Sequence, residues 1–196
     1  MNFIPAALIE MRAEELWQRF RLEPKFDVEA LLDYLDLKLL WTGLSDGILA
    51  EITPYDRRIS VNERRRMEFD QNLGLYRFTL AHEVGHWFLH AEGARSGSGL
   101  LFDAQSLFGR DGRASPMETQ AHKFAGALLA PRHEVVAAQA GRPWEGWQEV
   151  GRLAGEFDMS KLAMFIRLKE LQLAHEDERG VPASGRAVDP RQGSLL

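Results

Sequence analysis

The feature that most constrains the fold is the run from Phe78 to His90, which is largely apolar but carries His82, Glu83 and His86 in the pattern HExxH. Histidines four residues apart on an α-helix lie one above the other, so both imidazoles can reach one metal ion. At about 100° per residue, the polar side chains of this run fall within an arc of roughly 100°, and apolar side chains cover the rest. The sequence therefore predicts a buried helix whose polar stripe faces a cleft or a ligand.

Two readings of this helix compete. Burying two histidines beside a carboxylate is costly without a partner, and a zinc ion would supply one. Otherwise, the helix belongs to the core and its histidines hydrogen-bond to neighbouring groups. The coincidence of the motif with a strongly apolar helical pattern favours zinc.

A catalytic zinc site normally has three protein ligands, so a third is needed. His90 follows His82 by eight residues, which separates the two by about 12 Å along a helix axis. We therefore expect His90 to contact a metal ligand without binding the metal itself, to line the cleft, or to lie exposed at the end of the helix.

Glu118 is the stronger candidate for the third ligand. Ser115 as N-cap, Pro116 in the first turn and Pro131 past the end define a helix that carries Glu118 on its mostly apolar side. The same spacing is also a capping box, in which the Glu118 side chain would bond back to the Ser115 amide. The ligand interpretation is favoured by small residues that would let this helix approach the histidine helix closely: Ala121, Ala125 and Gly126.

Other polar side chains are candidates for supporting roles. His122, one turn after Glu118, would orient a ligand or serve as a spare one. A donor to the oxyanion of a tetrahedral intermediate would come from His90, His122, Tyr76 or Tyr55, and the sequence does not choose among them.

Two blocks of sequence together resemble the ImmA/IrrE family of metallopeptidases. They are Arg77–His86, reading RFTLAHEVGH, and Glu118–Pro131, reading ExxAxxFAxxLLxP. The resemblance continues through the segment 153–168 and covers roughly residues 10–173. It implies a zincin-like fold with a gluzincin-type site.

In that site, the resemblance makes His82, His86 and Glu118 the ligands of one zinc ion and Glu83 the general base. It further implies a cytoplasmic protease whose protein substrate is a helix-turn-helix transcriptional repressor. One departure is that family members often carry Asn where His122 stands, which leaves the role of this position open.

Composition is in keeping with one intracellular enzyme domain. A chain of 196 residues can bury one sizeable core. The absence of cysteine excludes disulfides and thiolate ligands. A net charge of -5 argues against strong nonspecific nucleic-acid binding. The start of the chain has no basic, apolar leader and no segment could span a membrane, so we expect a cytoplasmic location.

The remaining patterns predict an α+β fold. Helices are expected at 5–20 and 27–36, followed by strands at 37–41, 47–52 and 58–62 in a small three-stranded sheet, antiparallel in part. The strand at 47–52 is either an ordinary edge strand or one that pairs with an extended substrate. The glycine-rich segment 93–114 is either a lid or a silent insertion.

The C-terminal part is expected to be helical. Helices at 132–140, 143–157 and 160–174 would complete a metallopeptidase domain at 1–175, with a helix-turn-helix-like subdomain at about 132–175 and a disordered tail at 176–196. Core packing is the favoured role of the last helix. The rival function is a regulatory or interaction module with structural zinc, closed by His122 or His90, whose terminal helices bind DNA or a protein. A latent protease that acts only after a signal is a third possibility.

Overall fold

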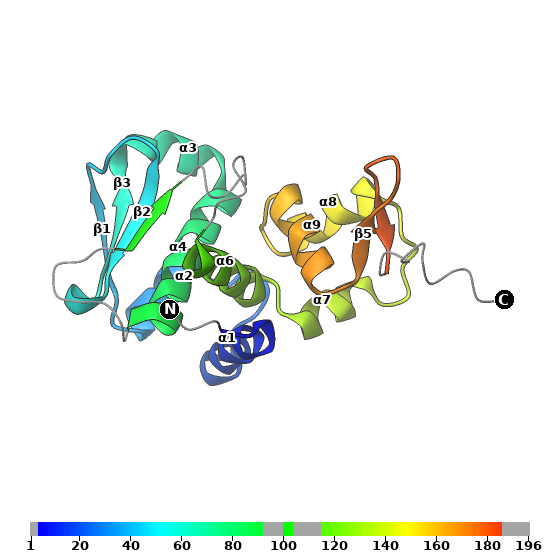
Figure 1. Cartoon of the computed structure of the whole chain (residues 1–196), viewed down its shortest axis with the longest axis horizontal. Coiled ribbons are helices and arrows are strands. Elements are labelled where there is room, and N and C mark those ends of the chain that lie inside the picture. The colour runs from blue at the N-terminus through cyan, green and yellow to red at the C-terminus, as the bar shows by residue number, and fades with distance from the viewer. Residues whose placement is uncertain (1–3, 92–99, 104–114, 186–196) are drawn as a thin grey trace.

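A small sheet and the long helix packed on it, α4 (Leu73–His90), form one end of the molecule (Figure 1). The computed structural model describes residues 4–91, 100–103 and 115–185. The other helices are α1 (Ala6–Phe20), α2 (Val28–Tyr34), α3 (Arg66–Gln71), α6 (Pro116–Leu129), α7 (Arg132–Gln139), α8 (Trp147–Glu156) and α9 (Lys161–Glu170). The strands are β1 (Lys38–Thr42), β2 (Ile48–Thr53), β3 (Arg58–Asn62), β4 (Leu100–Asp103), β5 (Ala174–Glu176) and β6 (Pro182–Ser184). The fold is thus mixed α+β and mostly helical, as predicted.

The main sheet has the strand order β1-β3-β2-β4. β1 runs parallel to β3, whereas β2 is antiparallel to both β3 and β4. The three expected strands are present, and β4 joins them from within the segment 93–114. The other residues of that predicted lid or insertion lie outside the described ranges.

The position of β2 corrects the prediction that 47–52 is an edge strand. Ile52 pairs with Ile59 of β3 on one side and with Leu100 of β4 on the other. Both edges of β2 are therefore occupied along this stretch, and β4 is the outer strand on that side.

The sheet and α4 share one apolar core. Leu49, Ala50 and Ile52 of β2 are buried, and α4 covers this layer with Leu80 and Val84, which are also buried. The sheet and α4 each have an apolar face that is stabilised by removal from water. The two faces pack together, and this packing fixes the position of α4 on the sheet.

The ends of the helices follow local signals in the sequence. Asp27 caps α2, accepting the N–H of Glu29 at 2.9 Å. The short helix α3 was not predicted, because its six residues span fewer than two turns and bury only Phe69.

α7, α8, α9 and the hairpin β5–β6 form the end of the molecule opposite the sheet, with α1 and α6 between the two (Figure 1). α9 ends at Glu170, earlier than predicted, since Gln172 adopts φ +60 and turns the chain toward β5. Residues 176–185, within the predicted tail, lie in and beside this hairpin. Residues 186–196 lie outside the described ranges, and a helix-turn-helix-like arrangement of α7–α9 stays a prediction.

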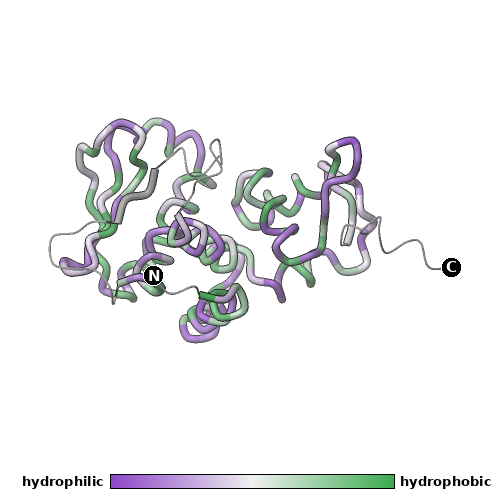
Figure 2. Tube along the Cα trace, viewed as in Figure 1, coloured by the Kyte–Doolittle hydropathy of each residue, from purple (hydrophilic) through white to green (hydrophobic). Residues whose placement is uncertain are grey.

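Hydrophobic and hydrophilic residues are interspersed along the coloured helices in Figure 2. Among the described residues, no helix is both long and apolar enough to cross a membrane.

Candidate metal centre

The centre lies where α4 meets α6, and a glycine allows the two helices to approach. A Cβ atom on Gly85 would lie 3.1 Å from the carbonyl oxygen and 3.2 Å from the Cα of Ala121. Any side chain at this position would press on the α6 backbone. Gly85, which lies between Glu83 and His86 in the HExxH motif, therefore allows the close spacing of the two helices. Ala121 faces α4 as expected, but Gly126 lies against Arg167 of α9 instead.

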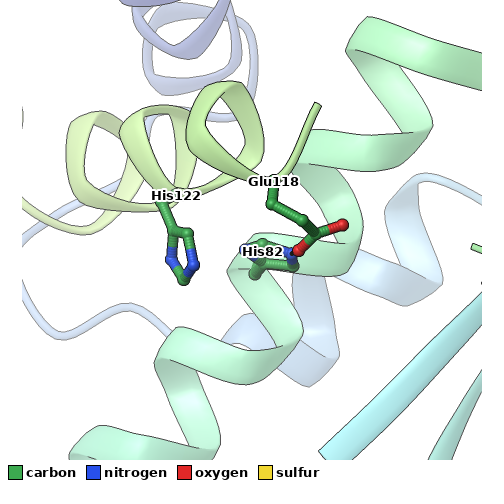
Figure 3. A group of neighbouring side chains, drawn as sticks. All are labelled: His82, Glu118 and His122. Carbon is green, nitrogen blue, oxygen red and sulfur yellow. Dashed lines mark hydrogen bonds and ion pairs between the residues drawn. The ribbon is translucent and has the colours of Figure 1, made fainter. Parts of the chain in front are cut away.

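Three side chains from these helices converge on one point. His82 Nε2 lies 3.0 Å from His86 Nε2 and 3.1 Å from Glu118 Oε2, while His86 Nε2 lies 3.1 Å from Glu118 Oε1. Both histidines are fully buried, and the Glu118 side chain is 18% exposed. Figure 3 shows the Glu118 carboxylate meeting the His82 ring between the two helices.

The N-terminus of α6 explains how Glu118 comes to face the histidines. Ser115 Oγ accepts the N–H of Glu118 at 3.2 Å, so the cap forms on the Ser115 side. The Glu118 carboxylate does not complete the capping box but lies against His82 and His86. Of the two interpretations left open by the sequence, the geometry matches the one in which Glu118 joins the histidines.

The electrostatics of this cluster are those of neutral imidazoles around a carboxylate. Burial lowers the pKa of His82 from 6.5 to about 3, so its contact with Glu118 is a hydrogen bond and not an ion pair at neutral pH. Burial alone would raise the pKa of Glu118, but the contacts of its carboxylate with His82 and His86 outweigh burial and hold that pKa well below its usual range. The result is an ionised carboxylate held beside two imidazole nitrogens.

A zinc ion fits this donor set. Tetrahedral ligands at about 2.0–2.1 Å from zinc lie roughly 3.3 Å from one another, and the three donor contacts here measure 3.0–3.1 Å. Two imidazoles and one carboxylate are also donors that zinc prefers. A shared cation would relieve the crowding of lone pairs with movements of a few tenths of an ångström.

Glu83 is buried beside this cluster, on the side of α4 that faces the sheet. Neither carboxylate oxygen has a hydrogen-bond partner among the described residues, although the N–H of Ile52 on β2 is near enough to lower the pKa slightly. Burial, followed by the nearby charges of Glu118 and Glu51, raises the pKa of Glu83 well above 4.5. A buried carboxylate whose oxygens have no hydrogen-bond partner within residues 4–91, 100–103 and 115–185 is suited to exchange a proton with a ligand.

His122 forms a second, overlapping donor set with His82 and Glu118. One donor atom from each of these three residues lies within 4.8 Å of the others. His122 projects from α6 beside Glu118 (Figure 3), and its ring lies 4.6 Å from the ring of His82. We favour the set that contains His86, because its contacts are shorter. Burial lowers the pKa of His122 to about 4, so it too is neutral near pH 7.

His90 lies behind His86, away from the converging donors. Its Nδ1 is 3.0 Å from His86 Nδ1, and its Nε2 is 2.9 Å from Oε1 of Gln120 on α6. Burial lowers the pKa of His90. Gln120 was not predicted from the sequence, since a glutamine near the start of a helix gives no signal that it is buried.

The two tyrosines considered as oxyanion donors differ in their surroundings. The Tyr76 hydroxyl donates to Glu29 of α2 at 2.7 Å, and its ring stacks on Trp41 of β1. Tyr55 is 71% exposed on the short 3₁₀ turn between β2 and β3. The Tyr76 hydroxyl thus has Glu29 as its partner, and a role for either tyrosine as an oxyanion donor stays a prediction.

Comparisons with known proteins identify a family and a similar fold. Residues 54–169 match the family model Peptidase_M78, described as the IrrE N-terminal-like domain. The fold is similar to that of a Mycobacterium tuberculosis transcriptional regulator, with a TM-score of 0.57 and 16% identity. The match covers 92% of this chain but 55% of that protein, so the chain spans about half of its length. No curated protein sequence matches the chain.

Proposed function

Since the chain belongs to the Peptidase_M78 family of IrrE N-terminal-like domains, we propose that it is a zinc-dependent metallo-endopeptidase with a zincin-like, gluzincin-type site. One observation carries the proposal: the donor atoms of His82, His86 and Glu118 converge within 3.0–3.1 Å next to the buried carboxylate of Glu83.

In this proposal His82, His86 and Glu118 hold one zinc ion. When bound, the ion supplies Lewis acidity that makes water more acidic and a carbonyl more electrophilic. Glu118 contributes the negative charge of the ligand set, and its depressed pKa keeps it ionised when the ion binds.

Glu83 is the proposed general base. Its carboxylate would accept a proton from the attacking water and pass it to the departing amine nitrogen. A base of this kind works best with a pKa near the working pH, and burial moves the pKa of Glu83 upward in that direction. The same burial keeps bulk water from competing for the proton.

His122 is our candidate for stabilising the oxyanion. It lies beside His82 and Glu118 and stacks on Phe78 at 5.7 Å between ring centres, which would hold its ring in place. Removal of one such donor typically costs 10²–10³ in kcat.

The proposed substrate is a protein, bound in part as an extended segment along the sheet. β2 pairs on both sides, so such a segment would pair instead with β4, the outermost of the described strands on that side of the sheet. By the family resemblance, the substrate would be a helix-turn-helix repressor, and cleavage would take place in the cytoplasm to control transcription.

The test combines zinc content with cleavage of the helix-turn-helix repressor encoded nearest to this protein. Wild type, Glu83→Gln and Glu118→Gln are compared, with Glu15→Gln as a control for loss of an exposed carboxylate. We expect about one equivalent of zinc in every protein except Glu118→Gln, and cleavage by wild type and Glu15→Gln alone. Cleavage by Glu83→Gln at the wild-type rate, or absence of zinc from wild type, would refute the proposal.

A second candidate function rests on His122. If His82, His86, Glu118 and His122 all bound the ion, the site would be closed by four protein ligands and would be structural. The protein would then be a metal-stabilised module that binds DNA or a protein partner. In that case His122→Ala would lose zinc and stability, whereas Glu83→Gln would change neither zinc content nor partner binding.

A further inference from the structure

We propose that His90 and Gln120 are positioning residues, which fix the orientation and the tautomer of His86 so that its Nε2 lone pair points at the metal site. The inference rests on the proposed function, since it assigns a role to residues behind one of the proposed ligands. It concerns a chain of two hydrogen bonds that runs from α4 to α6.

The direction of these hydrogen bonds follows from the groups at each end. Gln120 Oε1 can only accept, so His90 Nε2 must carry a proton and donate it. An uncharged His90 with its proton on Nε2 has a lone pair on Nδ1, and that atom must accept from His86 Nδ1. His86 therefore carries its proton on Nδ1 and presents an unprotonated Nε2 to His82 and Glu118.

The arrangement places a hydrogen-bond acceptor where a metal-binding imidazole needs one. A ligating histidine generally donates its second N–H to a nearby acceptor, which holds the ring and raises its basicity. Here the acceptor is another imidazole, itself held by a glutamine that is 6% exposed. With so little access to water, Gln120 has few alternative partners, so the chain has one favoured arrangement.

The location of Gln120 adds a second consequence. Glu118 and Gln120 are two residues apart at the start of α6, while His86 and His90 are one turn apart on α4. One helix therefore supplies both a proposed ligand and the support for a ligand on the other helix. Any movement of α6 would disturb the Glu118 contact and the orientation of His86 together.

The experiment measures zinc affinity of the full chain by competition with a chromophoric chelator, and does so separately from cleavage. His90→Leu removes both the acceptor and the donor, and we expect zinc affinity to fall about 10–100-fold. His90→Gln, which offers an acceptor and a donor on a side chain of similar reach, should recover most of it. His133→Leu, which removes a half-exposed imidazole beside Glu14, is the matched control and should bind zinc like wild type.

Gln120 tests the direction of the chain. Gln120→Glu can only accept, so it should keep or increase zinc affinity, whereas Gln120→Leu should lower it several-fold. If the bond ran the other way, with the glutamine amide donating, Gln120→Glu would weaken binding as much as Gln120→Leu. The cobalt-loaded proteins provide a second readout, since a reoriented His86 in His90→Leu would shift the visible absorption bands of cobalt.

Equal zinc affinity and equal cobalt spectra in wild type and His90→Leu would overturn the inference, as would equal losses in the two Gln120 variants. These results differ from failure of the proposed function, in which wild type itself binds no zinc or cleaves no substrate. Melting of the metal-free variants shows whether any loss reflects unfolding, and His90→Gln and Gln120→Glu keep the test valid if the leucine variants do not fold.

Discussion

Two regions of the molecule each bury an ionisable side chain, and the regions differ in the hydrogen-bond partners that they provide for it. At the junction of α9 with α1, Arg167 is 1% exposed, yet its Nε donates to the carbonyl oxygen of Ala130 at 2.9 Å and its Nη2 to Glu10 at 2.8 Å. Between α4 and the sheet, Glu83 is fully buried, and neither oxygen has a hydrogen-bond partner among the described residues.

The difference separates structural polar groups from functional ones. Burying a charge is tolerated when the chain itself supplies the partners, as it does for Arg167. A buried carboxylate that lacks partners within the described part of the chain lowers stability, and this cost is typical of a functional group. The contrast therefore predicts that Arg167 matters for folding and Glu83 for function.

The largest expected effect on stability is that of Arg167→Met. Removal of the guanidinium leaves the Ala130 carbonyl and Glu10 without their partner, which should cost about 3 kcal/mol in the free energy of unfolding. Urea unfolding measures this loss, and zinc affinity should change by less than about twofold. Arg142→Met, at an exposed position, is the control and should stay within about 0.5 kcal/mol of wild type. If Arg167→Met also stayed within about 0.5 kcal/mol of wild type, the proposed difference between Arg167 and Glu83 would be contradicted.

The opposite sign is expected for Glu83→Gln in the metal-free protein, which should be more stable than wild type by about 2 kcal/mol at pH 8. The pKa of Glu83 is raised above 4.5 in the fold, so above pH 4.5 the folded protein retains a proton that the unfolded chain has released. The cost of this carboxyl group grows as the pH rises and disappears as the pH falls toward 4.5. Unfolding measured from pH 4.5 to 8 should therefore show the gap between the two proteins widening with pH, and a constant gap would contradict the assignment.

Acid should destabilise the histidine cluster, and the Glu83→Gln background isolates this effect. His82 and His122 have pKa values of about 3 and about 4 in the fold because of burial, while the unfolded chain takes up protons below about 6.5. Stability should fall as the pH is lowered from 6.5 toward 4, by about 1 kcal/mol for each histidine over the first pH unit. Melting of metal-free protein between pH 7 and 5.5 tests this, and unchanged stability across that range would show that these rings are not buried in solution.

The smallest predicted effect sharpens the role of helix spacing. Gly85→Ala should push α6 away from α4 and lower zinc affinity about tenfold, equivalent to about 1.4 kcal/mol. Gly155→Ala on α8 is the matched control, because a Cβ there meets nothing within 4 Å, and it should add about 1 kcal/mol of stability through helix propensity alone. Chelator competition and thermal melting together separate the two outcomes, and tighter zinc binding in Gly85→Ala would be evidence against the close approach.

Local patterns predicted the elements that carry the cluster. The histidine helix, the helix from Pro116 and the cap at Ser115 follow from periodicity, proline and the capping serine. The spacing of Ser115 and Glu118 is compatible with a capping box and with a metal ligand. Only the packing of α6 against α4 brings Glu118 to the histidines and decides between these two interpretations. How the site works stays a prediction until zinc and cleavage are measured.

The features that the sequence did not reveal depend on contacts between distant segments. β4 is four residues long and is a strand only because β2 offers it an edge, and the hairpin β5–β6 is even shorter. Tyr76 carries a polar hydroxyl near the motif, but its direction is set by Glu29, 47 positions away. Gln120 gave no signal for the same reason, because its burial comes from helix α4 and not from its own neighbours.

The cap at the start of α6 makes the geometry of the centre independent of the length of chain that precedes it. Ser115 and Pro116 fix locally where α6 begins, and its packing against α4 fixes its rotation, so the directions of Glu118 and Gln120 do not depend on how many residues lie between α4 and Ser115. Homologous or engineered chains can therefore gain or lose residues ahead of Ser115 without retuning the centre. A single residue inserted within the first turn of α6 would instead rotate the helix by about 100° and misalign every downstream side chain.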